Sequence, residues 1–580
     1  MQERDTDGPD WEPPGGSTWG TPDDAARATA RYREVAGRVL EALFESDPEW
    51  ATDLGVHTYD DQLTDLSADG IAARAGMVQE ALAALDDVDD TGLPIDDRVD
   101  LEILRTALSG QAWTLGELRE HETNPLLHLP GDALYPLIVR EAREPAERLR
   151  SIVARLAAVP HRLEVARTVL HDMPRVHVET AMLQAQGAAA LLGPELEALV
   201  EREPTLRAEV EPVRVAARAA LADHVRWLEA QLPVSDGDPR LGEQAYAARL
   251  WYSLDTETGP DALLTRAESD LQAMEEEIAE MAATIAGRPA RAGQVRDVLD
   301  ALAASAPVTD HTILSLCEQA LEDATRRVRE ADLVTVPDTG VQIIVMPESR
   351  RGVAVAYCDA PGPLEPGAGD GTLPTFFAVS PTPEGWPAER VASFYREYNG
   401  HMLRNLAVHE AMPGHVLQLA HNTRHEGSTR VRSAFRSGPF VEGWAVYAEQ
   451  LMATAGFGLG PEVDAGLRMQ QLKMQLRTTI NAILDVRVHA RGMTEAEAMA
   501  LMTVRGHQEE GEAAGKWRRA LLTSAQLSTY YVGYREMVDT ATRLREANPG
   551  LPDPRRHDRM LAYGSPPPRH LKRLLGLNTS

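Results

Sequence analysis

Along most of this chain the hydrophobic residues recur at three- and four-residue steps, the period of an α-helix with one buried face. The first such segment starts near Asp24 and includes Ala28, Tyr32, Val35, Val39, Leu40 and Leu43. Pro48 is expected to stop it, because proline has no backbone N–H to continue the hydrogen-bond ladder. Residues 144–231 are predicted to form several antiparallel helices, broken at Pro160, Pro174, Pro204 and Pro212.

Three short segments depart from the helical period. Residues 341–346, 352–357 and 375–380 are rich in β-branched or aromatic side chains and are bounded by Pro, Gly and Asp. They predict one small sheet, with a Gly- and Pro-rich loop at residues 361–374. The helical period returns after Trp386 and persists to the end. The predicted fold is therefore mainly α: a large multi-helix bundle with one small sheet at about residues 341–380.

Composition narrows the class of protein. Hydrophobic residues make up 43 %, enough for a large core, while residues 1–24 carry few large apolar side chains and predict a disordered tail. The formal net charge of −31 disfavours binding to nucleic acid or an anionic membrane surface. The two cysteines, Cys317 and Cys358, exclude a disulfide framework. The polar start and the lack of a long apolar run predict a cytoplasmic protein.

The strongest chemical signal is the stretch from His409 to His415, which reads His-Glu-Ala-Met-Pro-Gly-His. In the H-E-x-x-H motif of zinc enzymes, four residues turn the helix by about 400°, so both imidazoles face one way. Six residues turn an ideal helix by about 600°, which would leave His415 about 120° off the face of His409. Proline and glycine at 413 and 414 could absorb the two extra residues, so we predict a helix interrupted at Pro413.

These residues and a downstream segment predict a site for one Zn²⁺ ion. The segment Phe440–Glu449 lies on the next amphipathic stretch and offers two carboxylates seven residues apart. We predict His409, His415 and Glu442 as the metal ligands, because catalytic zinc is usually held by imidazoles and a carboxylate. Glu410 follows the first ligand and is predicted to be the general base. Glu449 is interpreted as a partner of an imidazole N–H or as a plain surface acid.

Hydrolysis also needs a donor for the developing oxyanion. Tyr530 is the first candidate, with Tyr531 and Tyr534 as alternatives. Asp485 and His489 are four residues apart and can pair, so His489 is a second candidate donor or else part of a structural pair. His421 and His425 have helical spacing but no adjoining Glu, and we interpret them as an exposed polar face.

The same motifs resemble a bacterial family known as domain of unknown function 885. The resemblance rests on His409–His415 with Gln418, Glu442–Glu449, Asp485 with His489, Gln526 with Tyr530 and Gly533, and Gly564–Pro567. Weaker matches lie at Gly55 and Tyr59, at Asn124-Pro125 and at Leu241-Gly242. That family is similar to the helical, gluzincin-like zinc peptidases of the carboxypeptidase Taq, angiotensin-converting enzyme and thimet oligopeptidase groups. The resemblance implies a deep cleft with zinc at its floor, a glutamate as third ligand, and Tyr and His donors downstream. Those relatives carry the shorter H-E-x-x-H.

The predicted function is zinc-dependent hydrolysis of amide bonds in short peptides. Hydrolysis of a non-peptide amide in a biosynthetic or detoxifying pathway stays open, as does a helical scaffold with a degenerate site. A di-iron oxidase is disfavoured, because no Glu lies three residues before a His. Cleavage at a carboxyl terminus would need a cation, for which Arg350, Arg351 and Arg477 are candidates. We predict an N-terminal helical region at 25–240 that covers the cleft and a catalytic region at 241–580; a monomer and a homodimer both remain open.

Overall fold

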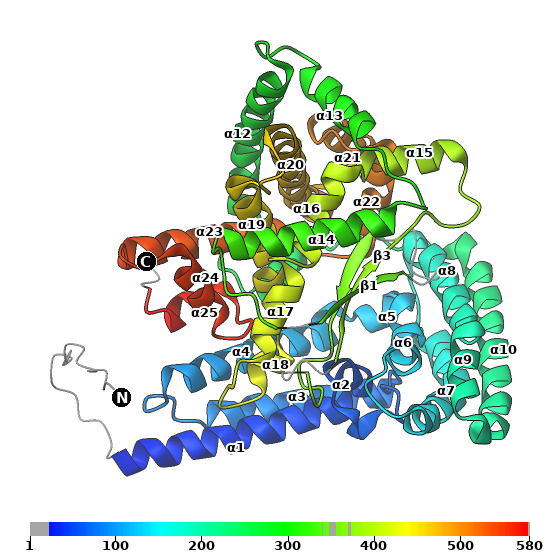
Figure 1. Ribbon diagram of the computed structural model, residues 1–580. Helices are drawn as coiled ribbons and strands as arrows, with labels where there is room; N and C mark the ends of the chain where they lie inside the picture. The colour runs from blue at the N-terminus through cyan, green and yellow to red at the C-terminus, as the bar shows by residue number, and fades with distance from the viewer. Residues whose placement is uncertain (1–21, 339, 347–354, 369–372, 578–580) are drawn as a thin grey trace.

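The computed structural model describes residues 22–338, 340–346, 355–368 and 373–577. The described chain is mainly helical with one small sheet, which confirms the predicted fold class. Figure 1 shows the sheet near the middle of the molecule, surrounded by helices from both halves of the chain. The first helix begins at Pro22, so nearly all of the expected tail, residues 1–24, lies outside the described residues.

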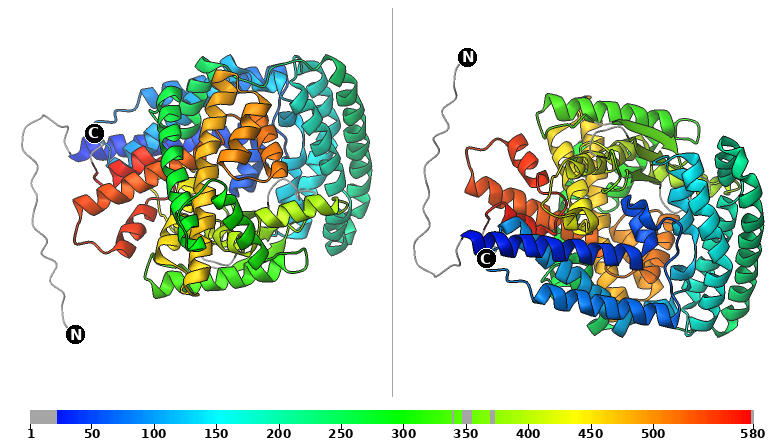
Figure 2. Two further views of the ribbon diagram at one scale, coloured as in Figure 1. Left: turned by 90° about the horizontal axis from the view of Figure 1, so that it is seen from above. Right: turned by 90° about the horizontal axis from the view of Figure 1, so that it is seen from below.

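Between residues 22 and 240 the described chain forms ten α-helices. They are α1 (Pro22–Ser46), α2 (Pro48–Leu54), α3 (Ala68–Asp86), α4 (Ile95–Trp113), α5 (Glu120–Thr123), α6 (Gly131–Val139), α7 (Pro145–Val169), α8 (Arg175–Leu191), α9 (Pro194–Arg202) and α10 (Arg207–Gln231). Short 3-10 or π turns lie between them: η1 (His57–Tyr59), η2 (Thr114–Leu118), η3 (Pro125–His128), η4 (Pro204–Leu206) and η5 (Leu232–Val234). Helices α7 to α10 make a layer of their own on one side of the molecule, which the two views in Figure 2 show as a bundle of long rods.

The rest of the chain holds the remaining helices. Before the sheet come α11 (Glu243–Leu254), α12 (Pro260–Ala286), α13 (Gln294–Ser305) and α14 (Ile313–Glu330). After it come α15 (Ala388–Glu397), α16 (Gly400–Glu410), α17 (His415–Thr423), α18 (Val431–Ala434), α19 (Gly438–Ala455), α20 (Pro461–Arg491), α21 (Glu495–Ala500), the π turn η7 (Leu501–Arg505), α22 (Glu510–Leu522), α23 (Ser528–Ala547), α24 (Asp553–Leu561) and α25 (Pro568–Leu574).

Two of the four expected proline breaks are wrong. Pro160 lies inside α7 and Pro212 inside α10, whereas Pro174 caps the start of α8 and Pro204 begins η4. An internal proline costs roughly 3 kcal/mol of helix stability. Helices α7 and α10 pack against each other and bury many leucines in one core, and each fully buried leucine contributes about 1.5–3 kcal/mol. Burial of the shared apolar face therefore outweighs the loss of one ladder bond.

In the described chain the sheet has three strands, β1 (Val341–Val345), β2 (Ala356–Asp359) and β3 (Thr375–Val379), in the order β1-β3-β2. Strand β1 runs parallel to β3 and β2 runs antiparallel to it. The first and third predicted strands are confirmed to within one residue. The second begins later than predicted, at Ala356, and residues 352–354 of that prediction lie outside the described residues. Strand β2 is an edge strand, and α16 lies beside it.

A buried set of ion pairs fastens the N-terminal helix α4 to the segment just before α19. Arg432 of α18 is 2 % exposed and donates from Nε to Asp100 Oδ1 at 2.5 Å and from Nη2 to Asp96 Oδ1 at 2.6 Å. Its Nη1 also donates to the carbonyl of Tyr563, 3.2 Å away. Val431, Ala434 and Leu574 join the apolar core of α1, α3 and α4. Residues from both halves of the chain thus contribute to this core and to these ion pairs.

His57 joins two loops and makes stability depend on pH. Its Nδ1 lies 2.8 Å from Asp60 Oδ2 and its Nε2 lies 2.8 Å from Glu365 Oε1. Burial by itself would lower the pKa of His57, but the hydrogen bonds with both carboxylates raise it to about 9. A raised pKa stabilises the fold fully below pH about 6.5, and this contribution is lost as pH rises through about 9. The shift corresponds to roughly 3 kcal/mol.

We therefore expect the His57→Gln variant to melt about 2–3 °C below the unmodified protein at pH 6. At pH 10 the difference should largely vanish, because the unmodified imidazole is then neutral. Thermal unfolding at both pH values checks this. His161→Gln, at an exposed histidine, is the control and should change neither value. An equal loss at both pH values would show that the charge of His57 is not what stabilises the contact.

Candidate metal centre

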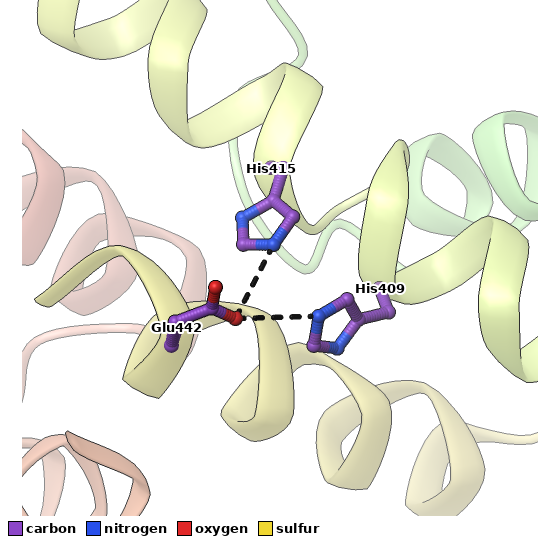
Figure 3. A group of neighbouring side chains, drawn as sticks. All are labelled: His409, His415 and Glu442. Carbon is purple, nitrogen blue, oxygen red and sulfur yellow. Dashed lines mark ion pairs between the residues drawn. The ribbon is translucent and has the colours of Figure 1, made fainter. Parts of the chain in front are cut away.

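Three side chains from three helices converge on one point. His409 lies at the end of α16, His415 at the start of α17 and Glu442 near the start of α19. Figure 3 shows both imidazoles pointing at the same carboxylate oxygen. The Nε2 atoms of His409 and His415 each lie 3.5 Å from Glu442 Oε2. The two rings stand nearly perpendicular, at 85°, with their centroids 4.8 Å apart. The structure thus gathers the side chains predicted as ligands.

The predicted interruption of the motif helix is confirmed. Helix α16 ends at Glu410 and α17 begins at His415, with a cis peptide between Met412 and Pro413. The turn at residues 411–414 packs against the end of α16, where Gly414 N donates to Val408 O at 2.9 Å. A Cβ atom at position 414 would lie 1.9 Å from the carbonyl oxygen of His409, so only glycine fits. This tight turn brings His415 back beside His409.

The helix that supplies Glu442 also holds the turn. Trp444 is fully buried, and its Nε1 donates to the carbonyl oxygen of Pro413 at 2.8 Å. A buried carbonyl that loses such a donor costs about 1–3 kcal/mol. The indole therefore links the third predicted ligand to the two histidines through the backbone between them.

Glu449 stands behind His409. It is 1 % exposed; its Oε1 lies 2.7 Å from His409 Nδ1, and its Oε2 accepts from Asn405 Nδ2 at 2.7 Å. The structure agrees with the first interpretation of Glu449, as a partner of an imidazole N–H, and not with the second, as a surface acid. With the proton on Nδ1, the lone pair on Nε2 is free and aimed at Glu442. Sequence reasoning missed Asn405, although its four-residue spacing from His409 places both on one helix face.

The electrostatics of the three side chains favour a positive charge between them. Burial would lower the pKa of His409, but hydrogen bonds with Glu442 and Glu449 raise it well above its ordinary value. Burial would raise the pKa of Glu442, but His415 and His409 hold it far below its usual range. With Glu410 alongside, three carboxylates surround two imidazoles. A divalent cation is the kind of ligand that this charge pattern suits.

The spacing also fits zinc. Tetrahedral coordination at about 2.0–2.2 Å places neighbouring donor atoms about 3.3–3.6 Å apart. Each imidazole nitrogen lies 3.5 Å from the glutamate oxygen, and all three ligand atoms lie within 4.8 Å of one another. Two imidazoles and one carboxylate leave a fourth position for water, as catalytic zinc sites do.

Glu410, the predicted base, is the last residue of α16, the helix that packs against strand β2. It is 8 % exposed, and among the described residues none donates a hydrogen bond to its carboxylate. Its charge reaches Cys358 of β2, whose pKa is raised by burial and then by Glu410. It also helps to raise the pKa of His409. A carboxylate without a protein donor, next to the convergent imidazoles, is available to accept a proton.

The three candidate tyrosines differ in what their hydroxyl groups do. Tyr531 donates to Asp270 Oδ2 at 2.7 Å, and Tyr534 donates to Gln450 Oε1 at 2.9 Å. Tyr530 instead accepts, from Arg519 Nη2 at 3.1 Å and from Gln526 Nε2 at 3.4 Å. Its own proton has no acceptor among the described residues, so of the three it is the one free to donate.

Two glycines place Tyr530 at the level of Glu442. A Cβ on Gly443 would lie 2.3 Å from the carbonyl carbon of Gly533, so the backbones of α19 and α23 touch there. One turn earlier on α23, the methyl group of Thr529 lies 3.3 Å from the position of a Cβ on Gly438. Tyr530 therefore lies on the part of α23 that packs against the first turns of α19, and its role as oxyanion donor stays a prediction.

His489 is surrounded by backbone carbonyl groups and an aromatic ring. Its Nε2 lies 2.9 Å from the carbonyl oxygens of both Ala520 and Thr523, and its ring stacks on Tyr246 at 9°. Asp485, its predicted partner, accepts from the backbone N–H groups of Ala525 and Ser528. The pair thus secures the turn before α23 rather than offering a proton to substrate, which disfavours His489 as the oxyanion donor.

Other predicted residues are also placed. His421 and His425 are half-buried rather than exposed, and each has a ring nitrogen within 3.1 Å of a backbone carbonyl oxygen. Arg350 and Arg351, candidates for a carboxylate contact, lie outside the described residues. Arg477 is already paired with Glu512, which leaves it poorly suited to that role.

The chain belongs to the family described as "Bacterial protein of unknown function (DUF885)", whose model matches residues 48–575. No curated protein matches it. No helix in the described part of the chain is both long and apolar enough to cross a membrane.

Two solved structures are similar over nearly their whole length. A proposed lipoprotein of unknown function from Shewanella oneidensis is 27 % identical, with a TM-score of 0.78 over 94 % of this chain and 99 % of that one. A proposed lipoprotein from Colwellia psychrerythraea is 16 % identical, with a TM-score of 0.76 over 95 % of this chain and 98 % of that one. The second likeness shows the shared fold alone.

Proposed function

We propose that this member of the family is a zinc-dependent hydrolase that cleaves amide bonds in short peptides. The observation that carries the proposal is the convergence of His409 Nε2 and His415 Nε2 on Glu442 Oε2, each at 3.5 Å. These three residues would hold the ion, and Glu449 would orient His409. A bound zinc ion supplies Lewis acidity, which lowers the pKa of water and polarises a carbonyl group.

Glu410 would act as the general base. Its carboxylate takes the proton from the attacking water and then passes it to the leaving amine, so one residue serves both halves of the reaction. The absence of a hydrogen-bond donor to it among the described residues leaves its oxygens free to accept that proton.

Tyr530 would donate its phenolic hydrogen to the oxyanion that forms as the carbonyl carbon becomes tetrahedral. Arg519 and Gln526 donate to the phenol oxygen, and its hydrogen has no acceptor among the described residues. Removing such a donor typically lowers kcat by about 10²–10³-fold.

Strand β2 would align the substrate. Within the described residues it lies at the edge of the sheet beside α16, and an extended peptide could add to a sheet edge through backbone hydrogen bonds. Backbone contacts of this kind give affinity without fixing side-chain identity. This arrangement, with the cleft that the resemblance to helical zinc peptidases implies, favours short peptides over folded proteins.

The proposal is tested with the intact protein and a synthetic peptide library read by mass spectrometry. We expect new cleavage products from the zinc-loaded protein, their loss after chelation, and their return when zinc is added. A library containing small non-peptide amides would separate peptide hydrolysis from amide hydrolysis in general. If the zinc-loaded protein cut neither kind of compound, the proposed function would be wrong.

A further inference from the structure

A second group of charged side chains lies on helices α20 and α22, and one of its members contacts Tyr530. We call Lys473 and Arg477 of α20, with Lys516 and Arg519 of α22, the basic cluster. Lys473 Nζ lies 2.9 Å from Glu397 Oε2, and Arg477 pairs with Glu512. Each of the two cations of α20 thus has a carboxylate partner. Lys516 and Arg519 of α22 have no carboxylate in ion-pair contact among the described residues.

Lys516 and Arg519 are the cations without a carboxylate. Lys516 is 5 % exposed and makes no hydrogen bond or ion pair with any residue that the structure describes. Arg519 forms no ion pair within the described ranges; its Nη2 donates to the hydroxyl of Tyr530 at 3.1 Å. A buried cation without a partner is costly, and here burial and the neighbouring Arg477 both lower the pKa of Lys516. An anion placed beside Lys516 would favour the charged form of its amine.

The basic cluster contacts the proposed oxyanion donor, Tyr530, through one side chain. Arg519 contacts Tyr530, and its guanidinium carbon lies 6.0 Å from the centre of that ring. Tyr530 lies opposite the first turns of α19, which carry Glu442. Gln526 adds a buried carbonyl oxygen, Oε1, with no hydrogen-bond partner among the described residues. An anion held by Lys516 and Arg519 would therefore lie close to the proposed oxyanion donor.

We propose that Lys516 and Arg519 form an anion subsite that binds a carboxylate of the substrate close to the amide bond being cleaved. The substrate class is then peptides with a free carboxylate, either the terminal group or an acidic side chain near it. The inference rests on the proposed function for the meaning of the subsite, although binding of a carboxylate can be measured without catalysis. Two cations around one carboxylate give charge-assisted hydrogen bonds, the strongest that proteins make.

The test measures peptide binding by calorimetry with the zinc-loaded, full-length Glu410→Gln protein. The probes are acetyl-Ala-Ala-Ala with a free carboxylate, the same peptide as its carboxamide, and acetyl-Ala-Glu-Ala carboxamide. We expect one of the two acids to bind about 10- to 100-fold more tightly than the neutral peptide, and which one does identifies the source of the carboxylate. Equal affinity for all three would overturn the proposal, even if the protein hydrolyses peptides.

Substitution of Lys516 should remove this preference. In Lys516→Met the acid is expected to bind only as tightly as the neutral peptide, whose affinity stays the same. Lys516→Arg keeps the charge and should keep the preference. Arg555→Gln is the control for net charge, since the Arg555 side chain is 72 % exposed. If the acid preference survived in Lys516→Met, the subsite would not involve this lysine.

Two further measurements distinguish a role of Lys516 in binding from a role in stabilising the fold. Lys516→Met should melt at the same temperature as the parent or higher, because it removes an unpaired buried amine and nearly conserves volume. A bound carboxylate raises the pKa of Lys516, so binding of the acid should take up protons, measured by calorimetry in buffers of different ionisation enthalpy. A lower melting temperature for Lys516→Met with no proton uptake in the parent would show that the lysine only supports the fold.

Discussion

Replacing Glu410 by glutamine is expected to lower kcat for peptide hydrolysis by about 10²–10⁴-fold, the usual contribution of a general base. Glutamine has the same shape but cannot take a proton from water. The side chain is buried and no described residue donates to it, so the exchange should disturb neither helix α16 nor the neighbouring strand β2. Zinc content should stay near one ion per chain, because Glu410 is not among the three convergent side chains.

Steady-state kinetics and elemental analysis of the same preparations decide this. Glu426→Gln removes an exposed carboxylate sixteen positions further on and should leave both quantities unchanged, which controls for the loss of one negative charge. Normal turnover in Glu410→Gln would mean that another group accepts the proton. Loss of zinc together with turnover would instead move Glu410 from base to ligand.

Replacing His409 by alanine is expected to abolish zinc binding, from about one ion per chain to none after dialysis. The three predicted ligands come from α16, α17 and α19, and His409 is the one that Glu449 holds in place. Removing a metal ligand should lower zinc affinity more than removing a residue that only hydrogen-bonds to that ligand. Loss of such a hydrogen-bond partner typically weakens metal binding by about 10- to 100-fold. Glu449→Gln should therefore show this smaller loss and His409→Ala the larger one.

Elemental analysis and competition with a zinc-sensitive dye measure the two losses. His425→Ala removes a half-buried imidazole that contacts the carbonyl of Ala562 and should bind zinc like the unmodified protein. If His409→Ala kept a full complement of zinc, the ion would have to be bound by other residues and the centre assigned here would be wrong.

Much of the candidate site follows from sequence because its signals are local. A six-residue spacing of two histidines conflicts with helix geometry, and Pro413-Gly414 supplies the means to resolve the conflict. That argument predicts a helix break at Pro413, and the structure confirms it, since α16 ends at Glu410 and α17 begins at His415. The helical period and the three β-branched runs likewise predict the fold class, since both patterns depend on neighbours along the chain.

What could not be predicted depends on contacts between distant segments. Pro160 and Pro212 remain inside helices because α7 and α10 cover each other's apolar faces, which no local pattern reports. Asp485 and His489 contact the backbone of the segment before α23, and their spacing in the sequence does not predict that contact. Lys516 carries no motif at all; its interest comes from burial without a partner, a property of the folded chain.

The bond network around Arg432 has a practical corollary for anyone dissecting the protein. Arg432 draws its acidic partners, Asp96 and Asp100, from α4, more than three hundred positions upstream. A truncated version that kept only residues 241–580 would lose both carboxylates and would expose Val431, Ala434 and Leu574, which pack against α1, α3 and α4. Activity screens should therefore use the uncut polypeptide, since a silent fragment would say nothing about the chemistry of its parent.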